Sequence, residues 1–247
     1  MKTLKITIIT LVAFFLASIM GCKKGNSPTP KVASSNAQVT FQMKAVNGSN
    51  LAGGTADTIA GLIWTAGTAH ISRFMFDAMR GGANIEVESD SVPPVNLFSL
   101  ALSSIPTYVT LDTGIYKEIG VSVFLKHTSD TSAIPLKLTG TFKNDSSKNI
   151  PIELDLNSNV TIKVEMNNID INGKTDYMVL VQMGLDKVTS GITANNLNHA
   201  TVTGGKIVIS QTSNYPLYDK IVDNLSRCGE SEWRERDHGD HDDHDWH

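Results

Sequence analysis

Three β-strands are predicted by residues 136–166, LKLTGTFKNDSSKNIPIELDLNSNVTIKVEM. In each strand apolar residues stand at every second position, which places them on one buried face and the polar residues between them in water. The apolar positions of the three strands are Leu136, Leu138, Gly140 and Phe142; Ile150, Ile152, Leu154 and Leu156; and Val160, Ile162, Val164 and Met166. A helical period would scatter these residues around all sides, so the stretch predicts a sheet with one apolar face.

The same period of two begins at residues 38–44, where Val39, Phe41 and Met43 alternate with polar residues. Further strands with more continuous apolar character are predicted at residues 69–78, 115–126, 177–183 and 206–210. Glycine and asparagine clusters such as Gly204-Gly205 separate them and are typical of turns. About ten short strands spaced in this way predict an all-β fold, an antiparallel Greek-key-type β-sandwich.

One C-terminal helix is predicted at residues 215–228. Asn214 is expected to cap it, Pro216 suits the first turn and Gly229 suits the end. Leu217, Ile221, Val222 and Leu225 would form one apolar stripe. We expect this stripe to close one end of the sandwich.

The first 22 residues, MKTLKITIITLVAFFLASIMGC, have the layout of a secretory signal. Lys2 and Lys5 precede an uncharged run over residues 6–20, which is shorter than the roughly 20 apolar residues of a membrane-spanning helix. Ile19-Met20-Gly21-Cys22 resembles the lipobox of bacterial lipoproteins, in which the cysteine is acylated. The resemblance implies a lipid anchor on Cys22, and the alternative is a buried hydrophobic helix.

Four segments follow from these observations. Residues 1–21 are predicted to be a lipoprotein signal peptide, 22–37 a flexible tether from acylated Cys22, 38–229 the β-sandwich domain with its terminal helix, and 230–247 a disordered acidic His/Asp-rich tail. The predicted location is the envelope of a Gram-negative bacterium. We expect the outer membrane, because lysines rather than an aspartate follow Cys22.

Charge and cysteine content exclude some functions. The net charge is −4, and the acids are concentrated after residue 229, so the chain has no basic field for nucleic acid. The chain contains two cysteines, and acylation of Cys22 would leave Cys228 without an intrachain disulfide partner. We expect Cys228 to be a small, half-buried residue at a helix end; the alternative is a reactive or metal-binding thiol.

The C-terminal sequence DHGDHDDHDWH is the chemically densest segment. Its candidate metal ligands are His238, His241, His244 and His247, with Asp240 and Asp243 as auxiliary ligands. Imidazole and carboxylate groups bind Zn²⁺ or Ni²⁺, and an unstructured tail would bind them weakly. The alternative is a solvated tail that keeps the protein soluble. No obligatory cofactor is predicted.

A family resemblance covers roughly residues 38–145, and its motifs lie in the stretch IEVESDSVPPVNLFSLALSSIPTYVTLDTGIYKEIGVSVFL, residues 85–125. Val95-Asn96-Leu97 with Leu100, and Gly114, Tyr116 and Ile119, resemble motifs of lipid-anchored bacterial β-sandwich domains of uncharacterised function. Those domains are loosely related to carboxypeptidase-regulatory and prealbumin-like modules. The resemblance implies a Greek-key sandwich and no activity, with Tyr116 as a core or corner residue whose hydroxyl reaches the backbone.

These features favour a non-enzymatic envelope lipoprotein. The lipid anchor would attach it to the membrane, and the folded domain would bind an envelope protein or a glycan. Trp64 and Tyr108 are candidate exposed aromatic residues for glycan binding, or else core residues. The alternatives are metal delivery by the tail and an enzyme of unrecognised type, for which the chain offers no known catalytic motif. Two further groups are expected to be structural: the isolated His70, His127 and His199, and the alternating Asp155, Asn157 and Asn159.

Overall fold

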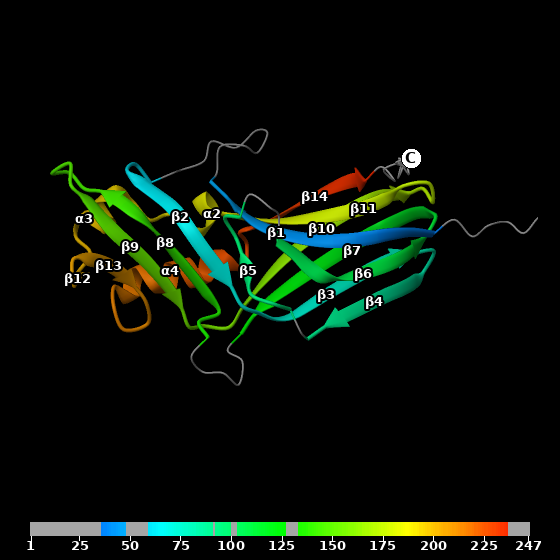
Figure 1. Ribbon diagram of the computed structural model, residues 1–247, viewed down its shortest axis with the longest axis horizontal. Helices are drawn as coiled ribbons and strands as arrows, with labels where there is room; N and C mark the ends of the chain where they lie inside the picture. Colours follow the sequence, from blue (N-terminus) through cyan, green and yellow to red (C-terminus); the bar gives the residue numbers. More distant parts are fainter. Residues whose placement is uncertain (1–35, 48–58, 91, 100–102, 127–132, 237–247) are drawn as a thin grey trace, which may run out of the picture. The chain divides into compact units, whose positions relative to one another are not determined.

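The computed structural model describes residues 36–47, 59–90, 92–99, 103–126 and 133–236. Within these residues the chain forms fourteen strands and three helices, which confirms the predicted all-β fold with a C-terminal helix (Figure 1). The strands make three sheets, called A, B and C below.

Sheet A has four strands in the order β14 (Gly229–Arg236), β11 (Asp176–Gly184), β1 (Asn36–Val46) and β6 (Ser103–Asp112). Strand β1 pairs parallel with β11 and antiparallel with β6, so the sheet is mixed. The alternation predicted for the start of the domain is confirmed, since Val39, Phe41 and Met43 are fully buried.

Sheet C also has four strands, all antiparallel, in the order β10 (Val160–Ile171), β7 (Gly114–Leu125), β3 (Ile71–Arg80) and β4 (Ala83–Ser89). Sheets A and C pack face to face. The ring of Phe41 lies 4.7 Å from that of Phe74 and 5.4 Å from that of Phe76. These contacts form the core of the predicted sandwich.

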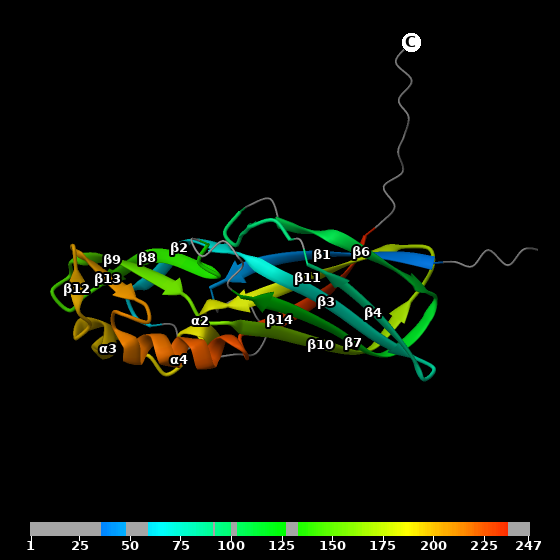
Figure 2. The ribbon, with the colours of Figure 1, turned by 90° about the horizontal axis from the view of Figure 1, so that it is seen from below.

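Sheet B has six strands in the order β12 (Val202–Thr203), β13 (Lys206–Ile209), β9 (Asn149–Leu156), β8 (Leu136–Lys143), β2 (Leu62–Ala69) and β5 (Val95–Asn96). Figure 2 shows helices on one side of this sheet. The helices are α2 (Leu185–Val188), α3 (Ala194–Asn198) and α4 (Tyr215–Leu225). The apolar face of the alternating strands at 136–156 therefore packs against helices. The sequence pattern had predicted that these strands belong to the sandwich.

Helix α4 forms where the sequence predicted a helix, but the residues expected to cap its two ends do not do so. Ile221 and Leu225 are fully buried, as the apolar stripe required. Asn214 precedes the helix in a left-handed conformation and makes no side-chain cap bond. Gly229 does not end the helix; it begins β14, where a Cβ would lie 2.7 Å from Ile162 Cγ2. Glycine is needed there because β14 passes close to β10.

The predicted C-terminal boundary needs correction. Residues 230–236 do not belong to a disordered tail, because they form β14 and pair with β11 in the register Val179 with Trp233. Trp233 packs against the core, and its ring lies 5.0 Å from that of Tyr177. The remaining predicted tail, 237–247, lies outside the described residues, as do the signal peptide and most of the tether.

The prediction for Tyr116 is confirmed. Its side chain is fully buried, and its hydroxyl donates a hydrogen bond to the backbone oxygen of Asp112, 3.1 Å away. The guanidinium of Arg80 lies 5.5 Å from the centre of the Tyr116 ring. Tyr116 thereby fixes the turn that joins β6 to β7.

Candidate binding surface

An uncharged segment forms much of the surface beside sheet B. Between Lys187 and Asp219 the only charged side chain is that of Lys206, although 19% of the whole chain is charged. The ammonium of Lys206 is held 2.9 Å from Glu153 Oε2. Apart from Lys206, the surface built from α3, β12, β13 and the start of α4 thus consists of hydroxyl, amide, imidazole and apolar groups. We call sheet B with its three helices the helical end.

Asn214 organises this surface. Its backbone is left-handed (φ 52°, ψ 42°), a conformation that asparagine tolerates better than most residues. Its side-chain nitrogen donates to the backbone oxygens of Thr201 (3.0 Å) and Val208 (2.8 Å), and its oxygen accepts from the Thr201 N–H (2.8 Å). Three bonds from one side chain therefore tie the β12–β13 hairpin to the start of α4.

Two hollows share Asn214 as a common wall. The first measures about 490 Å³ and is lined by Thr201, Thr203, Val208, Ser210, Thr212, Ser213 and Asn214. The second measures about 230 Å³ and is lined by Asn195, Asn196, His199, Ala200, Asn214, Pro216 and Leu217. The single titratable side chain in either lining is that of His199, and its Nδ1 lies 2.9 Å from the Asn195 backbone oxygen.

Several polar groups in the first hollow have unused hydrogen-bonding capacity. Ser210 and Thr212 bond to each other, with their hydroxyl oxygens 3.3 Å apart. The hydroxyls of Thr201, Thr203 and Ser213 have no bonding partner in the part of the chain that the structure describes. A hydroxyl both donates and accepts, so this hollow offers both functions without any formal charge.

Exposed aromatic and aliphatic side chains adjoin the hollows. Tyr215, directly after Asn214, is 55% exposed, and Val202 between two lining threonines is 48% exposed. The ring of Tyr215 stacks at 6.3 Å on that of Tyr218. Tyr218 is buried, and its hydroxyl accepts from the Asn157 N–H and bonds to Ser158 Oγ at 2.7 Å. Because Tyr218 is fixed by these bonds, it gives the exposed Tyr215 ring a fixed surface to stack on.

The aromatic candidates from the sequence behave differently from each other. Trp64 is only 4% exposed, and its indole nitrogen has no partner among the described residues, so Trp64 is a core residue. Tyr108 is 62% exposed, but it lies on β6 of sheet A, away from the hollows. Sequence reasoning missed Tyr215 and the threonines, although the scarcity of charge over residues 188–218 was a visible signal.

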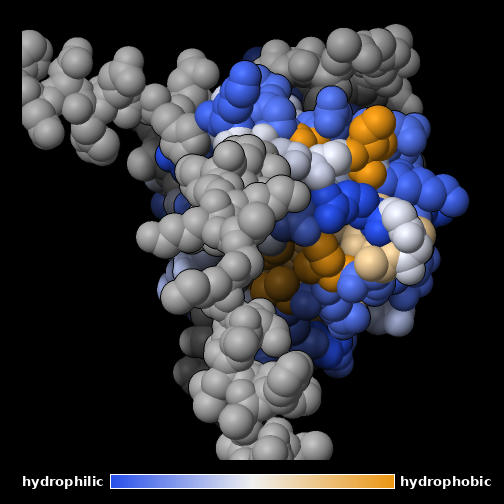
Figure 3. Space-filling model, turned by 90° about the vertical axis from the view of Figure 1, so that its right-hand side faces the viewer, coloured by the Kyte–Doolittle hydropathy of each residue, from blue (hydrophilic) through white to orange (hydrophobic). Residues whose placement is uncertain are grey.

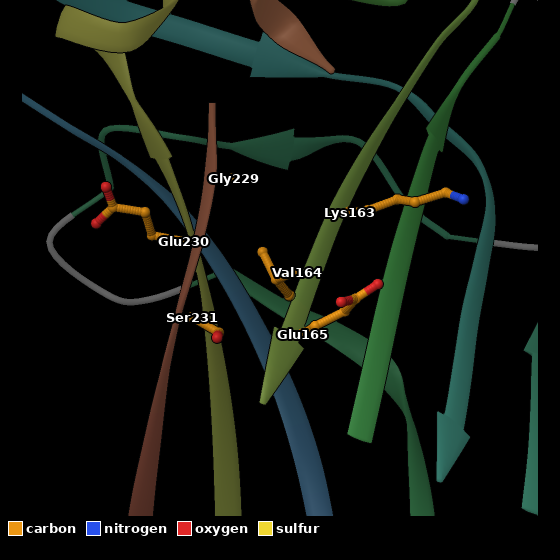
Figure 4. A pocket seen from close by; sticks show the side chains of 6 residues that line it. All are labelled: Lys163, Val164, Glu165, Gly229, Glu230 and Ser231. Carbon is orange, nitrogen blue, oxygen red and sulfur yellow. The ribbon is translucent and has the colours of Figure 1, made fainter. Parts of the chain in front are cut away.

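A groove lies between β10 and β14, but the charged side chains that line it do not point toward a common centre. It measures about 460 Å³ and is lined by Lys163, Val164, Glu165, Gly229, Glu230 and Ser231. Figure 4 shows the side chains of Lys163 and Glu230 extending away from each other. Glu230 forms an ion pair with Lys187 at the start of the helical region. This groove is the seam between the edges of sheets A and C.

A charged cluster lies on the face of sheet B opposite the helices. Lys137 Nζ is 2.8 Å from Glu153 Oε1 and 3.1 Å from Asp155 Oδ1. Hydrogen bonds from Lys137 and Lys206 lower the pKa of Glu153 to about 2. Burial raises the pKa of Asp155, and the neighbouring Glu153 raises it further. The arrangement is an ion-pair network that ties β8, β9 and β13 together.

The remaining predicted site residues do not assemble into a site here. Cys22, His127 and the metal candidates His238, His241, His244, His247, Asp240 and Asp243 lie outside the described residues. His70 is half-buried and His199 is exposed. Over the described ranges, no three His, Cys, Asp or Glu side chains are placed to hold a metal ion.

Cys228 is more buried than predicted. It has no exposed surface, and its Sγ donates to the Leu225 backbone oxygen at 3.1 Å. Burial raises the pKa of its thiol to about 12. Since the thiolate is the reactive form, Cys228 is an inert packing residue.

No protein-family model, curated protein or solved structure matches this chain. Over the described residues, no helix has the length and apolar character needed to cross a membrane. The resemblance to lipid-anchored sandwich domains therefore stays a prediction.

Proposed function

We propose that this protein is a non-enzymatic lipoprotein of the cell envelope that binds a partner through its helical end. The anchor is the acylated Cys22 inferred from the N-terminal sequence. The sandwich of sheets A and C separates Asn36, where the first described strand begins, from the binding surface. Both hollows lack a paired acid and base, since His199 is their single titratable lining residue and bonds to backbone.

The direction of β1 carries this proposal. The strand begins at Asn36, which pairs with Asp112, and we call this side of the sandwich the tether end. Nine residues later the Ala45 N–H donates to the Leu97 oxygen, and the Leu97 N–H donates to the backbone oxygen of Gly67 in sheet B. At about 3.3 Å per residue, β1 separates the two points by roughly 30 Å. A chain tethered before residue 36 is thus attached at the end remote from the hollows.

The tether end is built from charged turns. Arg80 Nη2 pairs with Asp112 Oδ2 at 2.9 Å, and the Gln38 N–H donates to Asp176 Oδ1 at 2.9 Å. Figure 3, which faces this side, shows hydrophilic residues surrounding a few apolar ones. The Arg80–Asp112 ion pair joins β3 to β6 and the Gln38–Asp176 bond joins β1 to β11, which suits a structural role.

Two experiments test the proposal, the first directed at the anchor. Cys22→Ala should abolish lipid modification, because no other thiol in the signal region accepts it. The mutant should then remain unprocessed or leave the detergent phase in a partition assay. A mutant that matured and partitioned as before would refute the anchor.

The second experiment asks which end meets the partner. A photo-crosslinking amino acid is placed at Thr203 in the first hollow or at Lys174 in the exposed β10–β11 turn of the tether end. In intact cells, crosslinked products should form mainly from position 203. Products formed mainly from position 174 would refute the assignment of the binding surface.

A further inference from the structure

We infer that the hollows of the helical end bind an uncharged, polyhydroxylated ligand, namely a neutral oligosaccharide. The inference rests on the proposed function, because it names the ligand class of the same surface. It follows from three properties of the lining: its charge, its hydrogen-bonding groups and its apolar borders.

The absence of charge excludes anionic and cationic ligands as the best fit. Neither lining contains an Asp, Glu, Lys or Arg side chain. Lys206, the one cation of the segment, is paired with Glu153. A phosphate, sulfate or carboxylate in these hollows would lose its hydration without gaining a counter-charge, which is costly. A ligand without charge avoids this cost.

The hydrogen-bonding groups match those of a sugar. Sugar hydroxyls donate and accept, and so do the hydroxyls of Thr201, Thr203 and Ser213. The second hollow adds the side-chain amides of Asn195 and Asn196, although Asn196 Oδ1 already accepts from Thr193. The volume of the first hollow, about 490 Å³, lies within the range of small-molecule sites.

The apolar borders distinguish a sugar from a protein partner. Protein interfaces have an apolar core enriched in aromatic residues, methionine and arginine. Here the exposed apolar groups beside the lining are Tyr215 and Val202, a small area next to many polar groups. A sugar ring has a C–H face and a rim of hydroxyls, and the Tyr215 ring offers an apolar surface to such a face while its hydroxyl donates to Asp219 Oδ1 at 3.4 Å.

The test measures binding of the mature lipidated protein, in detergent micelles, to defined oligosaccharides by isothermal titration calorimetry. The neutral probes are maltoheptaose, cellohexaose, xylohexaose, mannohexaose and N-acetylchitohexaose; the acidic probes are hexagalacturonate and a heparin hexasaccharide. At least one neutral probe should bind, with a Kd that changes less than twofold between 50 and 500 mM NaCl. Failure of every neutral probe, or preference for an acidic probe, would overturn the inference.

Variants locate the binding. Thr203→Asp and Thr212→Asp should each weaken binding of the neutral probe tenfold or more, because each places a carboxylate in the first hollow. Thr110→Asp is the matched control, an exposed strand threonine on β6 that should leave the Kd unchanged. Thr203→Val, which replaces the hydroxyl by a methyl group of similar size, serves if an acidic variant fails to fold. Unchanged binding by folded Thr203 and Thr212 variants would overturn the assignment.

The two proposals fail differently. If no oligosaccharide binds but position 203 still crosslinks a protein in cells, the ligand class is wrong and the binding end is right. If crosslinks come from position 174, the proposed function itself is wrong.

Discussion

The tether end and the helical end use polar residues in opposite ways. At the tether end, charged side chains such as Arg80 and Asp112 pair with each other and with the backbone of neighbouring strands. At the helical end, the linings of the two hollows contain no Asp, Glu, Lys or Arg side chain, and the hydroxyls of Thr201, Thr203 and Ser213 have no partner among the described residues. The first pattern fixes turns, and the second leaves hydrogen-bonding capacity for a ligand. We propose that the tether end serves attachment and that the helical end serves recognition.

The largest expected effect tests whether both regions share one cooperative core. Leu138 of sheet B and Ile162 of sheet C are fully buried. Replacing either by Asp buries an unpaired charge, so each variant should lose most of its stability or fail to fold. Urea denaturation followed by circular dichroism measures this.

Thr139→Asp is the control, because Thr139 is half-buried on the polar face of sheet B. It should be milder than Leu138→Asp. Equal losses at residues 138 and 139 would contradict the register of β8.

Two buried tyrosines, one at each end, allow the stabilities of the two ends to be compared. Tyr218→Phe removes the acceptor of the Asn157 N–H at the helical end, and Tyr116→Phe removes a bond to the Asp112 oxygen at the tether end. Each should cost about 1–2 kcal/mol of unfolding free energy, with the larger loss at Tyr218 because two bonds disappear. A Tyr116→Phe variant more destabilised than Tyr218→Phe would contradict this ranking in a urea titration.

The ion-pair network predicts an acid-sensitive contribution at the helical end. The folded-state pKa of Glu153, about 2, lies below its ordinary value of 4.5. Its contribution is therefore complete above about pH 4.5 and is lost as pH falls towards 2. Asp155 has a raised pKa, so its protonation opposes part of this loss.

Glu153→Gln should lower stability at pH 7 and flatten its decline between pH 4.5 and 2. Melting temperatures of both proteins across this range provide the measurement. A mutant curve parallel to that of the unmodified protein would remove Glu153 from the account.

The smallest stability effect is expected from the tail, which we propose as a weak metal site. A protein ending at Arg236 keeps β14 and removes all four tail histidines. Zn²⁺ or Ni²⁺ uptake should be lost on this truncation. The metals should barely change the melting temperature, because a site formed by the tail alone would bind the metal equally in the folded and the unfolded chain. Equal uptake by both proteins would exclude the tail.

The alternation of apolar residues predicted most strands but not their partners. Leu138 and Ile162 have the same pattern, yet one lies in the helix-covered sheet and the other faces the sandwich core. Strand β14 escaped prediction because five of the eight residues in its sequence, GESEWRER, are charged. Its place in the sheet depends on pairing with β11 and on the close approach at Gly229, which only the folded chain reveals.

The sequence shows that the residues of the candidate surface are largely uncharged, but it does not show how they are arranged. The uncharged run between Lys187 and Asp219 is visible in the sequence. That Asn214 joins Thr201 to Val208 is not visible, because the bonds depend on a left-handed backbone beside a hairpin. Tyr116, by contrast, was predicted correctly, since a buried tyrosine needs a nearby partner for its hydroxyl.

The separation of attachment from recognition is tested most directly by fluorescence quenching at a membrane. Lys174→Cys and Thr203→Cys each provide one reactive thiol for a fluorophore, because Cys228 is fully buried and Cys22 is acylated in the proposed mature protein. The labelled lipoprotein is anchored in vesicles that contain a headgroup-labelled quencher lipid. We predict stronger quenching at position 174 than at position 203. Equal quenching, or stronger quenching at position 203, would contradict the account.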